Sequence, residues 1–185
     1  MTRLKREAGF LKKLKNMLIG IIADTHNNVE MIIKAVSYLR SRRINTLIHA
    51  GDLSSPQMLD FFRGFDLHIV LGNDDCSNDE MNQKLSSLGL EPACCAKEFE
   101  FDGKKFILFH GDNVPMFRDA VNSEKYDYII KGHLHCVENY ERKNTRIINP
   151  GSLRKGEENT IAILDTSTGD VTHIDMNAVD PYNYS

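Results

Sequence analysis

Residues 17–26 read MLIGIIADTH, and this stretch sets the fold class of the chain. Its first part, Met17–Ala23, is a short, continuous apolar run, which is typical of a strand buried on both faces of a sheet. The run ends in Asp24, and His26 follows two positions later. Open α/β sheets bind their ligands at the carboxyl ends of the strands. We therefore expect Asp24 and His26 to lie at the binding edge of such a sheet.

The rest of the first half alternates apolar runs with amphipathic segments of helical period. The expected elements are a helix over 28–42, a strand over 46–50, a short helix over 55–62, a strand over 67–71 and a helix over 79–88. Together with the first strand, this β-α-β-α-β-α order predicts a mostly parallel sheet covered by helices.

The second half of the chain has the pattern of antiparallel strands. Asp102 and Gly103 form a strong hairpin turn signal between two strand-like segments. The expected elements are one helix over 114–122 and strands over 97–101, 104–110, 128–131, 137–142, 146–149, 160–165 and 171–175. We therefore predict an α/β fold in which a parallel half joins an antiparallel half, as two mixed β-sheets packed face to face and flanked by helices.

The length of 185 residues fits one domain with a sizeable core. Hydrophobic residues make up 41% and charged residues 26%, which excludes a disordered or disulfide-dense chain. No apolar run approaches the roughly 18 residues that a membrane-spanning helix needs, so we expect no membrane partner. We predict a single domain over 17–176, a disordered basic extension over 1–16 and a loose tail over 177–185.

The charge of the chain is unevenly distributed. The net charge is −3, but residues 1–16 hold six Lys/Arg and one Glu, which leaves −8 for the other 169 residues. An acidic domain is a poor electrostatic match for a nucleic-acid backbone, so nucleic acid is not an expected partner. A nuclease is the least supported alternative. The feature in its favour is a cluster of arginines at the end of a predicted helix: Arg40, Arg42 and Arg43.

The cysteine pattern indicates a reducing compartment. Cys76, Cys94, Cys95 and Cys136 include no C-x-x-C pair, which excludes a zinc knuckle or a thioredoxin-type motif. The chain before Met17 is basic and lacks the apolar segment of a secretory signal. Unpaired thiols and no secretory signal predict a cytoplasmic protein.

Five predicted strands end in residues whose side chains bind metals, and their carboxyl ends should meet at one edge of the fold. Histidine, aspartate and asparagine suit Mn²⁺, Fe or Zn²⁺ better than Ca²⁺. Seven such groups exceed the needs of one four-coordinate site and fit a pair of metal ions, which can hydrolyse phosphate esters. These groups come from the segments 24–26, 51–52, 72–75, 110–112 and 132–135.

These residues carry a family resemblance. Asp24-x-His26, Gly51-Asp52, Gly72-Asn73, His110 and Gly132-His133-x-His135 stand in the same order as the motifs of the calcineurin-like metallophosphoesterases, which the chain resembles from about residue 17 to 175. The small size and the Asn-Pro-Gly-Ser turn at 149–152 resemble the compact bacterial and archaeal phosphodiesterase branch. The resemblance implies a four-layer α/β/β/α sandwich and a phosphodiesterase that acts on a small phosphate ester.

The resemblance also implies a role for each ligand. Asp24, His26 and His135 would hold one divalent metal, while Asn73, His110 and His133 would hold the other. Asp52 would bridge them, and a hydroxide between the metals would be the nucleophile. The catalytic candidates are Asp52, Asn73 and Asp74, of which the last two would also contact substrate. Mn²⁺ is the first choice, with Fe, Zn²⁺ or Ni²⁺ as alternatives, and relatives are often dimers or larger, which allows a homo-oligomer.

Two positions depart from the family pattern. Asp74 stands where many members have a histidine that protonates the leaving group and where the compact branch has a cysteine. A carboxylate beside two dications should be ionised at neutral pH, which makes it a poor acid. Asp112 stands where relatives often have a second histidine, and it could orient His110 or be solvated.

Other interpretations of the same residues remain open. The change at Asp74 gives some weight to a non-catalytic protein-interaction scaffold on the same fold, although all seven ligand positions are filled. His49 and His68 lie inside strand patterns and are expected to be structural. Arg154 could meet a substrate phosphate or be solvated.

Overall fold

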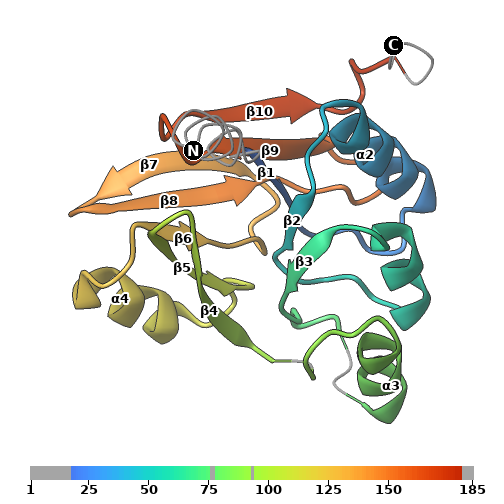
Figure 1. The fold of residues 1–185 in the computed structure, drawn as a ribbon, viewed down its shortest axis with the longest axis horizontal. Coiled ribbons are helices and arrows are strands. Elements are labelled where there is room, and N and C mark those ends of the chain that lie inside the picture. The colour runs from blue at the N-terminus through green and yellow to red at the C-terminus, as the bar shows by residue number, and fades with distance from the viewer. Residues whose placement is uncertain (1–17, 76–77, 93, 181–185) are drawn as a thin grey trace, which may run out of the picture.

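The computed structural model describes residues 18–75, 78–92 and 94–180 and contains two five-stranded sheets packed face to face (Figure 1). The first sheet has the order β10-β9-β1-β2-β3. Three of its strands run parallel: β1 (Leu18–Ile22), β2 (Thr46–His49) and β3 (Asp66–Ile69). The strand β9 (Thr160–Asp165) pairs antiparallel with β1, and β10 (Val171–Asp175) pairs antiparallel with β9. Because β1 lies in the centre of this sheet, its apolar run is buried.

The second sheet has the order β4-β5-β6-β8-β7. Its strands are β4 (Ala96–Phe101), β5 (Lys104–Phe109), β6 (Tyr128–Ile130), β7 (Val137–Arg142) and β8 (Thr145–Pro150). The prediction of an antiparallel second half is wrong here, because β5, β6 and β8 run parallel. Turn signals identify only local hairpins such as β4–β5, whereas the pairing of β6 with β5 and β8 joins strands that are distant along the chain.

Helices cover the outer face of each sheet. The first sheet carries α2 (Val29–Ser41), the 3₁₀ helix η2 (Pro56–Phe62) and α3 (Asp79–Ser87), while α4 (Val114–Ser123) covers the second (Figure 1). Three apolar cores lie between the four layers, one on the helix side of each sheet and one between the sheets. The four-layer α/β/β/α sandwich is therefore confirmed.

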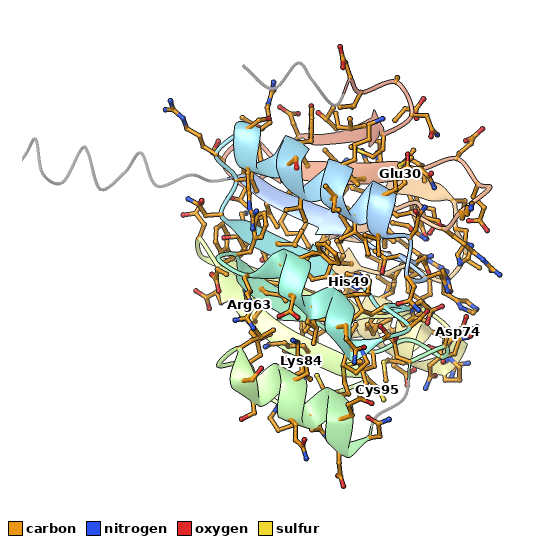
Figure 2. All side chains as sticks on the ribbon, turned by 90° about the vertical axis from the view of Figure 1, so that its right-hand side faces the viewer. Glu30, His49, Arg63, Asp74, Lys84 and Cys95 are labelled. Carbon is orange, nitrogen blue, oxygen red and sulfur yellow. The ribbon has the colours of Figure 1, made fainter. Side chains whose placement is uncertain are left out.

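Local sequence explains where the helices begin. An asparagine side chain accepts the backbone N–H three residues on at the start of α2, α3 and α4, which satisfies one donor that the first turn leaves unpaired. The three caps are Asn28, Asn78 and Asn113. On the outer surface, Asp60 of η2 pairs with Arg63 and with Lys84 of α3, so ion pairs connect the two helices. Figure 2 labels Arg63 and Lys84 on this face.

The ends of the predicted domain are described only in part. The expected basic extension, residues 1–16, lies outside the described residues, as do 181–185 of the expected tail. Within the described part of that tail, Val179 packs against the core below α2. No helix in the described ranges has both the length and the apolar composition to cross a membrane.

Candidate metal centre

The carboxyl ends of five strands, β1, β2, β3, β5 and β6, meet at one edge of the sandwich, and the loops that follow them are hydrogen-bonded to one another. The backbone N–H of Asp24 donates to the Gly51 carbonyl at 3.0 Å, and that of His26 donates to the Asp52 carbonyl at 3.0 Å. These bonds fasten the loop after β1 to the loop after β2. In the second sheet, the N–H of Gly132 donates to the His110 carbonyl at 2.8 Å.

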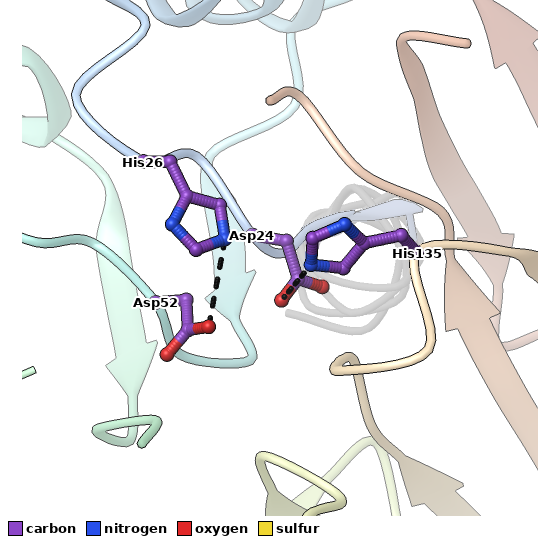
Figure 3. A group of neighbouring side chains, drawn as sticks. All are labelled: Asp24, His26, Asp52 and His135. Atoms are coloured by element: carbon purple, nitrogen blue, oxygen red, sulfur yellow. Dashed lines mark ion pairs between the residues drawn. The ribbon is translucent and has the colours of Figure 1, made fainter. Parts of the chain in front are cut away.

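Four side chains from three of these loops form a compact cluster that can hold a metal ion (Figure 3). Asp24, His26, Asp52 and His135 each offer one ligand atom, and these atoms all lie within 4.8 Å of one another. His26 Nε2 is 3.5 Å from Asp52 Oδ2, and His135 Nε2 is 3.3 Å from Asp24 Oδ1. Both carboxylates are almost completely buried.

The three other predicted ligands lie beside the same carboxylates or beside His110. His110 Nε2 is 3.3 Å from Asp52 Oδ2, 4.0 Å from Asp24 Oδ1 and 3.0 Å from Asn73 Oδ1. The His133 ring packs edge-on to that of His110, with 5.1 Å between centroids, and the His133 backbone N–H donates to Asp24 Oδ2 at 3.0 Å. The fold thus brings all seven predicted residues together, with Asp52 between His26 and His110.

Glycines make this close approach possible. A Cβ on Gly72 would lie 2.1 Å from Asp52 Oδ1, and a Cβ on Gly132 would lie 2.7 Å from Asp24 Oδ2. Neither carboxylate could keep its place beside a side chain at these positions. The motifs Gly72-Asn73 and Gly132-His133 therefore need glycine for steric reasons.

The backbone of the centre is strained. Five of the seven residues have positive φ although none is glycine: Asp24 at 51°, His26 at 40°, Asp52 at 58°, His133 at 69° and His135 at 52°. Left-handed backbone costs roughly 1–3 kcal/mol per non-glycine residue and clusters at functional sites. The surrounding hydrogen bonds hold these residues in conformations that turn their side chains toward one point.

The electrostatics reflect two acids crowded among histidines. Burial raises the pKa of Asp24 to about 6, against the opposing effect of His110 and His135. Burial also disfavours the ionised form of Asp52, but hydrogen bonds from His110 and from the Asp74 backbone outweigh it and lower its pKa. Burial likewise opposes charge on His110, whereas its bond to Asp52 and the nearby carboxylates raise its pKa to about 9.

These residues fit a divalent cation. His26 Nε2 is buried and has no hydrogen-bond partner within the described part of the chain, although it faces the Asp52 carboxylate. Burial lowers the pKa of His26, so its ring stays neutral, as a metal ligand must be. This imidazole nitrogen and the two buried carboxylates together provide ligands of the kind that bind Mn²⁺, Fe and Zn²⁺.

Two histidine rings, those of His110 and His135, form hydrogen bonds through Nδ1 with groups that the sequence did not predict. His110 Nδ1 donates to the Ala50 carbonyl at 2.8 Å, which leaves Nε2 facing the cluster. His135 Nδ1 lies 3.0 Å and 2.8 Å from the two carboxylate oxygens of Glu157. No motif marks Glu157, since it is one acid in an irregular loop.

The hypothesis that Asp112 orients His110 is wrong. Both ring nitrogens of His110 contact other groups, the Ala50 carbonyl and Asn73 Oδ1, and Asp112 is exposed.

His49 and His68 lie in β2 and β3 and outside the metal cluster. His49 is fully buried, and burial lowers its pKa to about 4. The Gly51 N–H donates to its Nδ1 at 3.2 Å, so its Nε2 carries the proton that faces Thr25 Oγ1 at 3.1 Å. It thereby links the two loops that carry Asp24 and Asp52. His68 stacks on Phe99 of the other sheet, with ring centroids 3.9 Å apart.

Comparisons with known proteins agree with this geometry. The sequence model of the calcineurin-like phosphoesterase superfamily domain matches residues 17–169. Phosphodiesterase MJ0936 of Methanocaldococcus jannaschii is 31% identical over 157 residues, which cover 81% of this chain and 93% of that protein. A probable metallophosphoesterase of Mycoplasma pneumoniae is 28% identical over 144 residues, which cover 72% and 77% of the two chains.

Solved structures share the architecture. The structure of an archaeal phosphodiesterase superposes with a TM-score of 0.77 at 29% identity and covers 85% of this chain and 98% of its own. Vps29 of Chaetomium thermophilum superposes with a TM-score of 0.63 at 16% identity, covering 85% and 96% of the two chains. At that lower identity the likeness shows the fold alone.

Proposed function

Because this chain belongs to the calcineurin-like phosphoesterase superfamily, we propose that it is a phosphodiesterase that hydrolyses small phosphate diesters with two bound divalent metal ions. The family consists of metal-dependent hydrolases of phosphate esters, which sets the reaction class. The observation that carries the proposal is the convergence of Asp24, His26, Asp52 and His135, whose ligand atoms lie within 4.8 Å of one another.

We assign the seven side chains to two metals that share one ligand. Asp24, His26 and His135 would hold the first metal, and Asn73, His110 and His133 would hold the second. Asp52 would bridge them, which is supported by its distances of 3.5 Å to His26 Nε2 and 3.3 Å to His110 Nε2. Mn²⁺ is our first choice of metal on the resemblance to the family, with Fe, Zn²⁺ or Ni²⁺ as alternatives.

The bound metals would lower the pKa of a water molecule and neutralise charge on the phosphate. The chain's own residues prepare the site for this chemistry. Asp24 and Asp52 are buried at the centre, and hydrogen bonds from His110 and the Asp74 backbone favour the ionised form of Asp52, so negative charge lies where a cation is needed. Asn73 and Asp74 are exposed at the open side of the cluster, where we expect a substrate ester to approach.

We further propose a cytoplasmic location, since the three cysteines in the described ranges, Cys94, Cys95 and Cys136, are free thiols. A homo-oligomer is proposed only by analogy with relatives. A nuclease gains no support. Arg40 and Arg42 lie at the C-terminal end of α2, and this helix leads away from the carboxyl end of β1. The Arg40 guanidinium lies over the Phe65 ring and that of Arg42 over the Tyr38 ring.

The proposal is tested with bis(p-nitrophenyl) phosphate as a generic aryl diester. Protein stripped with chelator and reloaded with Mn²⁺ should release p-nitrophenol, and Asp52→Asn or His133→Ala should abolish this release. Asp112→Asn is the matched control, because it removes an exposed acid near the same edge. Activity that survives both chelation and Asp52→Asn would contradict a metal-dependent reaction at this centre.

A non-catalytic interaction scaffold on the same fold is the second candidate. The feature in its favour is Asp74, which stands where the resemblance places a proton-donating histidine in many family members. Elemental analysis of the purified protein combined with an ester panel separates the two candidates. Bound metal without turnover of any ester would favour the scaffold, whereas metal-dependent turnover would exclude a purely structural role.

A further inference from the structure

Glu157 lies behind the histidine that closes the first metal subsite. Its two carboxylate oxygens are 3.0 Å and 2.8 Å from His135 Nδ1, and the opposite ring nitrogen is 3.3 Å from Asp24 Oδ1. The ring therefore donates its Nδ1 proton to Glu157 and turns the lone pair of Nε2 toward the cluster. A histidine bound to metal through Nε2 needs this tautomer.

The loop that carries Glu157 is fastened to the loop that carries Asp24. The Leu153 N–H and the Ser152 hydroxyl both donate to the Asp24 carbonyl, at 3.1 Å and 3.2 Å. Asn28 Nδ2 donates to the Leu153 carbonyl at 2.7 Å. These bonds hold the start of the irregular segment that carries Glu157, between β8 and β9, against the loop that carries Asp24.

Asp74 stands in a similar relation to the other histidine of that subsite. Its Oδ2 is 3.4 Å from His26 Nδ1, while His26 Nε2 faces Asp52. Its Oδ1 accepts a hydrogen bond from Asn73 Nδ2 at 2.9 Å. That bond sets the orientation of the Asn73 amide, whose Oδ1 then points at His110 Nε2 at 3.0 Å.

We propose that Asp74 and Glu157 are positioning residues of the metal centre, which hold His26, His135 and the Asn73 amide in the orientation that binds metal. This inference rests on the proposed function and adds two residues outside the ligand set. A carboxylate behind a metal-binding imidazole fixes its ring and increases its basicity, and its loss costs roughly 10–100-fold in metal affinity. At Asp74, the chain replaces a proton-donating group by one that orients its neighbours.

Calorimetric titration of Mn²⁺ into chelator-stripped protein tests the proposal without relying on turnover. Glu157→Ala should raise the Mn²⁺ dissociation constant roughly tenfold or more. Glu157→Gln should recover part of the loss, because the Gln carbonyl oxygen can still accept the Nδ1–H bond. Glu158→Ala is the control, since Glu158 is an exposed neighbour in the same loop.

The Asp74 variants should show a smaller effect of the same kind. Asp74→Ala should weaken Mn²⁺ binding by less than Glu157→Ala, because its contact to His26 is longer and its side chain is 49% exposed. Asp74→Asn keeps an acceptor oxygen and should bind Mn²⁺ more tightly than Asp74→Ala, and Asp112→Asn is the control. Unfolding temperatures in chelator should match the wild type, since both side chains lie on surface loops.

The outcomes are distinguishable. Wild-type protein that takes up no Mn²⁺ would overturn the proposed function together with this inference. Wild-type binding that is unchanged in both Asp74→Ala and Glu157→Ala would overturn only the positioning roles. Equal losses in Glu157→Ala and Glu158→Ala would also overturn them, because a general loss of negative charge would then explain the effect.

Discussion

His110 is the residue whose charge depends most on the tertiary structure. Burial disfavours its protonation, yet the bond to Asp52 and the nearby acids raise its pKa to about 9 from an ordinary value of 6.5. A raised folded-state pKa adds stability that is fully present below pH 6.5 and is lost as the pH rises to 9. The free energy of unfolding of the metal-free protein should therefore fall by up to about 3 kcal/mol across this window.

Urea unfolding in chelator between pH 6 and pH 9 measures this loss. The His110→Asn variant should have a flatter pH profile, because it lacks the titrating ring. Burial lowers the pKa of His26, His49 and His68 below this window. Asp24, with a pKa of about 6, titrates at its lower edge and also loses stability as the pH rises. A wild-type profile that is already flat from pH 6.5 to 9 would show that His110 is neutral in the folded protein.

In the proposed reaction, Asp74 would be the side chain next to the leaving group. Its carboxylate faces His26 and accepts a hydrogen bond from Asn73, so we expect no acid catalysis of leaving-group departure from this position. We expect aryl phosphodiesters to be hydrolysed much faster than alkyl ones, because aryl oxides are good leaving groups. Equal kcat values for a p-nitrophenyl and an alkyl diester, with chemistry rate-limiting, would contradict this expectation.

At the scale of elements, an aromatic stack joins the two sheets. His68 of β3 stacks on Phe99 of β4. Phe99 stacks on Phe106 of β5, with 5.0 Å between ring centroids, and Phe106 stacks on Tyr128 of β6, with 4.8 Å between centroids. Phe106 is completely buried. The strands β3, β5 and β6, which contribute rings to this stack, also lead into the loops that carry Asn73, His110 and His133.

Removal of the central ring should be costly. Phe106→Ala should lower the free energy of unfolding by about 3–5 kcal/mol, since it removes a buried aromatic side chain and leaves a cavity. Tyr140→Ala on β7 is the comparison, because Tyr140 is 38% exposed and should cost much less. Urea denaturation at pH 7 measures both, and similar losses in the two variants would show that the stack adds little.

At the scale of the whole molecule, a metal bound at the centre would join loops from both sheets. A ligand that binds only the folded protein at 100 times its dissociation constant stabilises it by about 2.7 kcal/mol. For a chain of this size that shift raises the unfolding temperature by roughly 5–10 °C. Differential scanning calorimetry with Mn²⁺ or with chelator should show this difference, and Asp52→Asn should remove it. A shift that persists in Asp52→Asn would place the bound metal elsewhere.

The helices, the strands and the seven clustered residues followed from the sequence because they depend on local signals. Apolar runs such as Met17–Ala23 identify buried strands wherever they stand in the fold, and asparagine caps mark helix starts. The Asp-x-His and Gly-His-x-His motifs could be recognised since each places its ligands within a few residues. The family assignment, based on such motifs in order, is confirmed by the match over residues 17–169.

Only the tertiary structure decided the pairing of β5, β6 and β8, the raised pKa of His110 and the contacts of Glu157. Each of these depends on groups far apart in the chain: Glu157 meets His135 across 22 positions, and His110 meets Asp52 across 58. Hydrogen bonds and charge interactions act over a few ångströms and carry no local pattern in the sequence. The sequence therefore identifies the candidate ligands of this centre, whereas the groups that orient them and shift their pKa values become visible only when the chain is folded.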